Sequence, residues 1–150
     1  MLRRTILILA TMSLGVLMLS GVALARDIPG TFAPDDLEGT NQADRIYGLG
    51  AADTITGKAG NDDCYGGSGA DTIRCGDGND RIDGGFGQDD LSGGPGDDTI
   101  SAADGQEDRV SCGQGTDTAY VDELDVVVDN PLSRCENVFL AARVPGGGPV

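Results

Sequence analysis

Aspartates recur every nine residues along the middle of the chain. The five central ones are Asp62, Asp71, Asp80, Asp89 and Asp98. Carboxylates are the hard oxygen ligands that divalent cations take, whereas acid–base catalysis relies on a pair of carboxylates with different pKa values. A regular row of carboxylates therefore indicates a metal-binding or a structural role before it indicates a catalytic one.

The aspartates belong to nonapeptide blocks over residues 57–101. These blocks read GKAGNDDCY, GGSGADTIR, CGDGNDRID, GGFGQDDLS and GGPGDDTIS. The fourth place holds Gly60, Gly69, Gly78, Gly87 and Gly96, and the eighth place holds Cys64, Ile73, Ile82, Leu91 and Ile100. Three places in phase over consecutive blocks define an internal repeat around which the rest of the chain is organised.

Each block provides one short strand and one turn. The apolar eighth-place residue can point to a core while its two neighbours point outward, as side chains alternate in a strand. The glycines allow the positive φ angles that a tight turn requires. We expect two blocks to complete one coil, so that residues 18 apart stack at about 4.8 Å.

Stacking places the aspartates in columns of like charge. Asp62 would lie over Asp80, and Asp80 over Asp98. Two such charges about 5 Å apart repel by ~1 kcal/mol in water and by ~3 kcal/mol at an effective dielectric constant near 20. A hard divalent cation neutralises such a column best, because it takes six to eight oxygens from carboxylates and from turn carbonyls.

The blocks resemble the hemolysin-type (RTX) calcium-binding nonapeptide, G-G-x-G-x-D-x-U-x. The resemblance implies an all-β fold, a parallel β-roll (a β-solenoid), with Ca²⁺ held between successive turns on both edges. It also implies that the sixth-place aspartate bridges two neighbouring ions and that carbonyls of the glycine turn complete each shell. In the family the roll often trails a protease, lipase or toxin, whereas this sequence contains only the roll.

Imperfect blocks extend the repeat to residues 30–120. They place Asp35, Asp44 and Asp53 before the regular core, and Asp108 and Asp117 after a one-residue insertion that follows Ser101. Counted together, the blocks predict about five coils. The best calcium sites are expected between Asp62 and Asp80, Asp71 and Asp89, and Asp80 and Asp98. Sites that use Asp35, Asp44, Asp108 or Asp117 are expected to be weaker or empty.

Residues 1–25 have the pattern of a secretory signal. Arg3 and Arg4 precede a mostly apolar stretch, and Ala23-Leu24-Ala25 fits the small-x-small cleavage rule. The alternative is an uncleaved membrane anchor. Cleavage would remove two arginines and no acid, changing the net charge from −15 to −17. We expect a secreted chain that repels nucleic acid and anionic membranes and that is disordered without calcium.

The two ends of the repeat are expected to differ from its middle. Residues 26–29 are interpreted as a linker. Residues 121–142 are interpreted as a C-terminal cap, with a last strand at Val126–Val128 and an apolar plug at Val138–Leu140, because a repeat stack needs an atypical cap at its open end. Residues 143–150 are expected to be disordered.

Four cysteines and no histidine are present. The predicted pairs are Cys112–Cys135, which clamps the cap, and Cys64–Cys75 within the roll, provided that the Cα atoms of Cys64 and Cys75 lie within the ~7 Å bridging limit. A Cys75–Cys112 bond would contradict two blocks per coil. Zinc is disfavoured, because C-x-x-C pairs and histidines are both missing.

We predict a non-enzymatic calcium-binding protein. Serine-hydrolase, zinc-protease and P-loop motifs do not occur in the sequence. The alternative function is a calcium-ordered adhesion or glycan-binding module of a surface or matrix, whose protein or glycan partner the sequence does not identify. Tyr47 and Tyr65, 18 residues apart, are either a ligand platform for such a partner or an aromatic pair that covers a narrow core.

Overall fold

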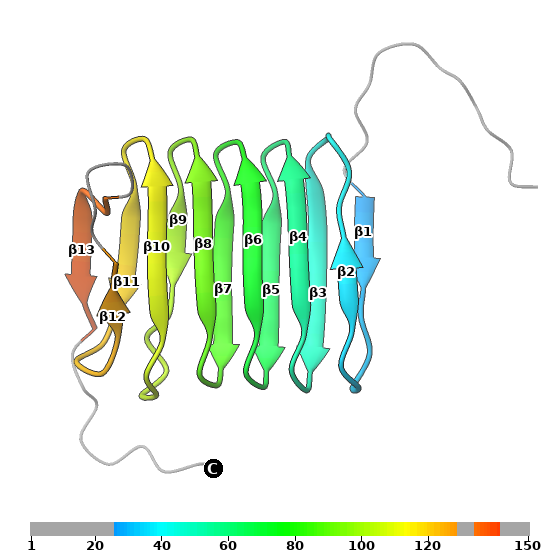
Figure 1. Ribbon diagram of the computed structural model, residues 1–150, viewed down its shortest axis with the longest axis horizontal. Coiled ribbons are helices and arrows are strands. Elements are labelled where there is room, and N and C mark those ends of the chain that lie inside the picture. The colour runs from blue at the N-terminus through cyan, green and yellow to red at the C-terminus, as the bar shows by residue number, and fades with distance from the viewer. Residues whose placement is uncertain (1–25, 129–133, 142–150) are drawn as a thin grey trace, which may run out of the picture.

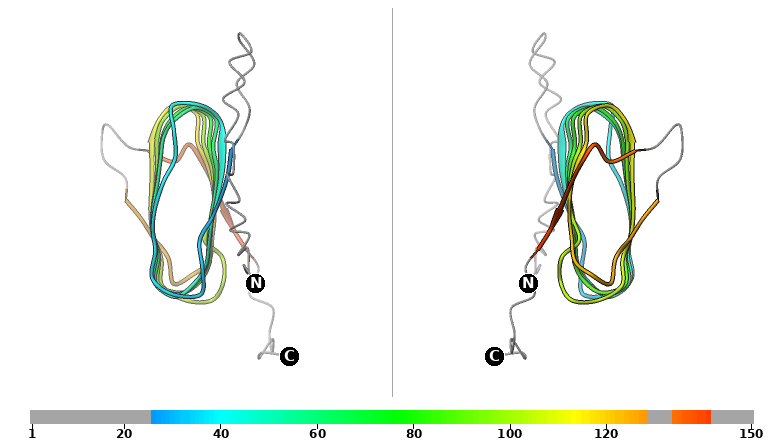
Figure 2. Two further views of the ribbon diagram at one scale, coloured as in Figure 1. Left: turned by 90° about the vertical axis from the view of Figure 1, so that its right-hand side faces the viewer. Right: turned by 90° about the vertical axis from the view of Figure 1, so that its left-hand side faces the viewer.

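The computed structural model describes residues 26–128 and 134–141. These residues form two parallel β-sheets that face each other in a flattened solenoid (Figures 1 and 2). The described segments contain strands, turns and bends but no helix, and therefore no helix that could cross a membrane. The predicted signal segment at 1–25 and the predicted tail at 143–150 lie outside the described residues.

The strands alternate between the two sheets along the chain. The seven-stranded sheet contains β1 (Arg26–Pro29), β3 (Asp44–Gly50), β5 (Asp63–Ser68), β7 (Arg81–Phe86), β9 (Thr99–Ser101), β11 (Thr118–Val121) and β13 (Asn137–Leu140). The six-stranded sheet contains β2 (Asp36–Glu38), β4 (Thr54–Ala59), β6 (Thr72–Asp77), β8 (Asp90–Pro95), β10 (Arg109–Gln114) and β12 (Val126–Val127). From β1 to β12, the chain crosses to the opposite sheet after each strand, as Figure 1 shows.

The pairing register confirms that two nonapeptides make one coil. Ile46 of β3 pairs with Cys64 of β5, and Cys64 pairs with Ile82 of β7, a step of 18 residues each time. After the insertion the step becomes 19, so that Thr99 pairs with Thr118. The solenoid has about six turns rather than the predicted five, because strands form beyond both ends of the counted blocks.

A single file of apolar side chains fills the space between the sheets. It consists of the eighth-place residues Ile46, Ile55, Cys64, Ile73, Ile82, Leu91, Ile100, Val110 and Ala119, together with the first-place residues Cys75, Ala102, Cys112 and Val121. All of them are at most 2% exposed. The predicted inward direction of the eighth place is confirmed, but the core remains narrow for a domain of this length.

Both ends of the roll differ from the sequence-based expectation. Residues 26–29 are not a linker but strand β1, which pairs with β3 in the 18-residue register because its backbone continues the coil. At the other end, β13 pairs with β11. The side chains of Val138 and Leu140 are 45% and 70% exposed. This segment extends a sheet and leaves its apolar side chains exposed, so the apolar plug, and with it a cap, is not confirmed.

Both predicted disulfides are present. Cys64 in β5 bonds Cys75 in β6, with the Cα atoms 6.5 Å apart. The distance is short enough because the eighth and first places both point into the core, so this disulfide joins the two sheets. Cys112 in β10 bonds Cys135, with the Cα atoms 5.2 Å apart, and it ties residues 134–141 to the regular roll.

Aromatic side chains pair on the outer surface of the seven-stranded sheet. The rings of Tyr47 and Tyr65 stack with centroids 5.1 Å apart and planes 6° from parallel. Near the C-terminal end, Tyr120 and Phe139 stack at 5.4 Å. Each pair joins neighbouring strands, which is the geometry of stabilising cross-strand contacts.

Candidate metal centre

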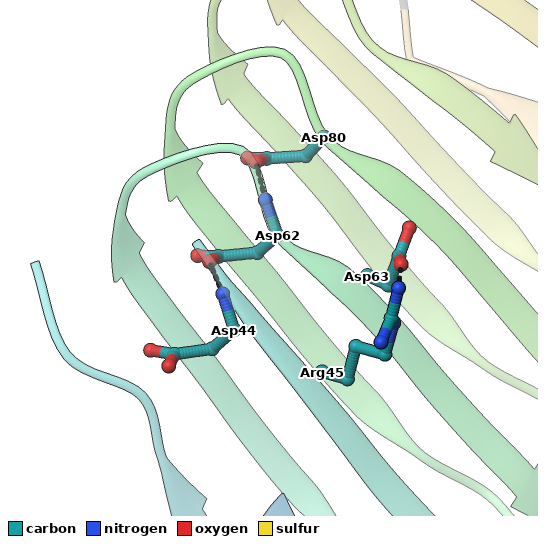
Figure 3. Close-up of polar contacts among 5 residues, drawn as sticks. All are labelled: Asp44, Arg45, Asp62, Asp63 and Asp80. Carbon is teal, nitrogen blue, oxygen red and sulfur yellow. Dashed lines mark hydrogen bonds and ion pairs between the residues drawn. The ribbon is translucent and has the colours of Figure 1, made fainter. Parts of the chain in front are cut away.

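The sixth-place aspartates form one column along each edge of the roll. One column contains Asp35, Asp53, Asp71, Asp89 and Asp108, and the other contains Asp44, Asp62, Asp80, Asp98 and Asp117. Within a column, the backbone N–H of each aspartate donates to Oδ1 of the aspartate one coil later, at 2.8–2.9 Å. Figure 3 shows this arrangement for Asp44, Asp62 and Asp80.

The local sequence explains why these acids are buried. The sixth place lies two residues before the apolar eighth place, and side chains in a strand alternate between faces. Each aspartate from Asp44 to Asp117 in the two columns therefore points to the same side as the core residues, and each is at most 3% exposed. The nine-residue period that places apolar side chains in the core therefore also places a row of carboxylates inside the molecule, next to the turns.

One oxygen of each of these buried carboxylates lacks a hydrogen-bond partner. The unpartnered atoms are Oδ2 of Asp53, Asp62, Asp71, Asp80, Asp89, Asp98, Asp108 and Asp117, and Oδ1 of Asp44. A buried polar atom without a partner costs about 1–3 kcal/mol, and more when it is charged. The eight Oδ2 atoms recur in two regular columns, an arrangement that a row of bound cations would explain.

The first-place glycines keep a small space open beside these oxygens. A Cβ built on Gly48 would lie 2.5 Å from Oδ2 of Asp53 and 2.5 Å from the carbonyl oxygen of Gly66. A carboxylate oxygen and a carbonyl oxygen from successive coils therefore face the same point. The glycine prevents a side chain from filling that point.

The turns also depend on glycine at the second and fourth places. Positive φ angles occur at second-place Gly67, Gly76, Gly85, Gly94 and Gly113, and at fourth-place Gly60, Gly69, Gly78, Gly87, Gly96 and Gly115. Non-glycine residues also take positive φ angles at these places, namely Leu49 and Lys58 at the second place and Ala51 at the fourth. The fourth-place glycines predicted as carbonyl ligands stack closely, since a Cβ built on Gly78, Gly87 or Gly96 would overlap the carbonyl oxygen of the fourth-place glycine in the preceding coil.

Replacing Gly78 with alanine is expected to destabilise the roll strongly. Its φ is +143°, and an added Cβ would overlap the backbone carbonyl of Gly60 in the neighbouring coil, so the two coils would have to separate. Gly105→Ala is the matched control, because Gly105 also has a positive φ (+92°) but no atom within 4 Å of the built Cβ.

We expect a loss of ~1 kcal/mol for Gly105→Ala, from backbone strain alone, and at least twice that loss for Gly78→Ala. Denaturant unfolding of the calcium-loaded proteins measures the difference. Equal losses for the two variants would contradict the close packing of the turns.

Burial makes the charge on the aspartates unfavourable in the absence of a cation. Burial, and to a smaller extent the charge of neighbouring carboxylates, raises the pKa of Asp98 and Asp108 to about 7. The pKa of Asp80 and Asp89 is raised to about 6 for the same reasons. The hydrogen bond from the backbone N–H of the preceding coil opposes these shifts but does not cancel them.

The donor set fits calcium better than a transition metal. Among the described residues, no three Asp, Glu, His or Cys side chains converge on one point. A cation here would be held by individual carboxylates with several backbone carbonyls, and such all-oxygen, flexible surroundings suit Ca²⁺. The cysteines are joined in disulfides and provide no thiolate ligand.

Two acids outside the nonapeptide pattern extend the columns. Oδ1 of Asp125 accepts the N–H of Asp108 at 3.0 Å, and Oε2 of Glu136 accepts the N–H of Asp117 at 2.9 Å. Their separations from those partners are 17 and 19 residues, so a strict search for a period of 18 misses both. A search for acids that tolerates one residue of slippage would have found them.

Comparison with protein-family models identifies the repeat. Four copies of the model described as the RTX calcium-binding nonapeptide repeat match residues 30–64, 38–73, 65–100 and 89–119. The chain belongs to the RTX calcium-binding nonapeptide repeat family. The RTX match spans every aspartate from Asp35 to Asp117 in both columns, whereas Asp125 and Glu136 lie outside it. Searches of curated proteins and of solved structures gave no match.

Proposed function

We propose that this RTX protein is a secreted, non-enzymatic calcium-binding protein whose roll folds around Ca²⁺ ions held between stacked turns. One observation carries the proposal: Oδ2 is buried and unpartnered in Asp53, Asp62, Asp71, Asp80, Asp89, Asp98, Asp108 and Asp117. In each of these turns, the aspartate Oδ2 and carbonyl oxygens of the glycine turns would hold the ion. Bound Ca²⁺ supplies the positive charge that makes ionised carboxylates tolerable inside the roll.

Secretion is supported by the sequence and by the cysteines. Residues 1–25 combine a basic start, an apolar stretch and an Ala-x-Ala site. Two disulfides within the described residues favour an oxidising compartment, where such bonds persist. Extracellular calcium is present at millimolar concentration, which suits modules with dissociation constants near 10⁻⁴–10⁻³ M.

The proposed function is tested by neutralising one central carboxylate. Asp80→Asn keeps an oxygen that can accept the N–H of Asp62 but removes the charge beside the turn. We expect fewer bound Ca²⁺ ions per chain and a higher calcium midpoint for folding. Asp77→Asn is the control, because Asp77 is exposed in the same turn and loses the same formal charge.

Calcium titration calorimetry and far-UV circular dichroism measure the two effects. Identical ion numbers and midpoints for Asp80→Asn and Asp77→Asn would contradict calcium binding at the buried column.

A second candidate function is calcium-ordered adhesion to a glycan or a protein. The stacked pairs Tyr47–Tyr65 and Tyr120–Phe139 favour it, because both lie on the outer surface of the seven-stranded sheet and Tyr120 and Phe139 are 45% and 53% exposed. Aromatic faces are suitable surfaces for sugar rings. Glycan-array binding that requires Ca²⁺ and is lost in Tyr120→Ala would support adhesion; the same array without binding would leave calcium binding as the function.

A further inference from the structure

The first turn on each edge of the roll is closed differently from those that follow. In Gly39–Asp44, the N–H and the hydroxyl of Thr40 both donate to Oδ2 of Asp44, at 2.6 and 2.8 Å. In Gly30–Asp35, the N–H and the hydroxyl of Thr31 donate to Oδ2 of Asp35 in the same way, at 2.6 and 2.9 Å. The second-place threonine thus satisfies the oxygen that is unpartnered in every later block.

The backbone of these two turns differs as well. Within the described residues, positive φ angles begin at Leu49 and continue through the second and fourth places of the later turns. Thr31 and Thr40, and the fourth-place residues Ala33 and Gln42, are not among the residues with positive φ. Instead, each threonine hydroxyl accepts the N–H of the fourth-place residue, at 3.1 Å from Ala33 and 3.2 Å from Gln42.

We propose that Thr31 and Thr40 close the first turn of each edge in place of a metal ion, so that the calcium array begins at Asp53 on one edge and at Asp62 on the other. This inference rests on the proposed calcium-binding function of the later turns. It assigns a role to two threonines that stand at the second place of the repeat, where most of the later turns have glycine.

Competition for the same oxygen is the physical reason. A cation at Oδ2 of Asp44 would have to displace two hydrogen bonds to an ionised carboxylate, which are among the stronger hydrogen bonds in proteins. Asp44 also reverses the pattern of the later aspartates, because its Oδ1 rather than its Oδ2 lacks a partner. At Asp62, by contrast, a cation would displace no hydrogen bond from Oδ2.

The consequence is a roll with a calcium-independent start. The first coil is held by threonine hydrogen bonds and by the pairing of β1 with β3, and each later coil adds an edge that needs Ca²⁺. The first coil thus offers strand edges with which the strands of the next coil can pair as the Ca²⁺ concentration rises.

The sequence offers a direct test, because two substitutions convert the closed turn into the open type. Thr40→Gly with Gln42→Gly changes GTNQAD (39–44) into GGNGAD, which differs from GGSGAD (66–71) only at the third place. We expect the full chain with both changes to bind one more Ca²⁺ ion than the wild type, counted by native mass spectrometry and by calorimetry with CaCl₂.

The reverse exchange is the matched control. Lys58→Thr with Gly60→Gln introduces both features of the closed turn at Gly57–Asp62, and we expect one ion fewer with the β-sheet signal retained. If the double variants do not fold, the single variant Thr40→Val provides the test, because it removes only the hydroxyl. That variant should leave the ion number unchanged and lower the melting temperature of the loaded protein, whereas Thr40→Ser should restore it.

The outcomes separate the two hypotheses. Unchanged ion numbers in both double variants, or an unchanged melting temperature in Thr40→Val, would overturn the threonine closure while the wild type still binds calcium. A wild-type chain that binds no Ca²⁺ would overturn the proposed function and, with it, this inference.

Discussion

Removal of Ca²⁺ at pH 7.5 is expected to convert the folded roll into a largely disordered chain. The core is one file of side chains between two sheets, which is too little apolar burial to offset the conformational entropy of a Gly-rich chain. The folded state must also bury two columns of carboxylates in a chain of net charge −15. Without a cation, each of these terms favours unfolding.

Far-UV circular dichroism during a chelator and CaCl₂ titration measures this transition. The β-sheet signal should appear near 10⁻⁴–10⁻³ M Ca²⁺. Each site saturated to 100 times its dissociation constant would add about 2.7 kcal/mol. Mg²⁺ should restore little signal, because it requires a tight octahedron and retains its water ligands. A metal-free chain with the full β-sheet signal at this pH would refute the prediction.

The strands and their register could be predicted from the sequence because a single period controls them. The core file contains Ile46, Cys64 and Ile82, which pair from strand to strand. Side chains alternate between the two faces of a strand, and two blocks make one coil, so the three side chains must all point to the same face of the sheet. The same period carries Asp44, Asp62 and Asp80 into one column. Where every coil repeats the same contacts, local spacing is enough to determine the three-dimensional neighbours.

The ends of the roll could not be predicted from the period, because there the neighbours are not repeats. Thr40 closes a turn through its hydroxyl, and Asp125 and Glu136 enter the columns with one residue of slippage. These contacts depend on the turn conformation of a few residues rather than on spacing. The sequence predicts an apolar plug at Val138–Leu140, but these residues are exposed in β13, because an apolar pattern alone does not show whether a facing surface exists.

Acidification is expected to fold the metal-free chain. The pKa of Asp98 and Asp108 in the roll is about 7, and that of Asp80 and Asp89 is about 6, mainly because burial disfavours their charge. In the unfolded chain the same groups titrate near 3.9. The folded state therefore binds protons more tightly, so the stability from these groups is fully present below pH ~3.9 and is lost as the pH rises through 6 to 7.

Circular dichroism of the chelated protein between pH 8 and pH 5 tests this linkage. The β-sheet signal should be low at pH 8 and rise as the pH falls through 7 and 6, as protons neutralise the columns that Ca²⁺ otherwise neutralises. The double variant Asp98→Asn with Asp108→Asn should retain more β-sheet signal at pH 8, because its neutral amides add no buried negative charge to the folded state. In the presence of calcium the direction is opposite: protons compete for the carboxylates, so the calcium midpoint should be higher at pH 6 than at pH 8. A metal-free signal that stays constant from pH 8 to pH 5 would show that charge burial does not control folding.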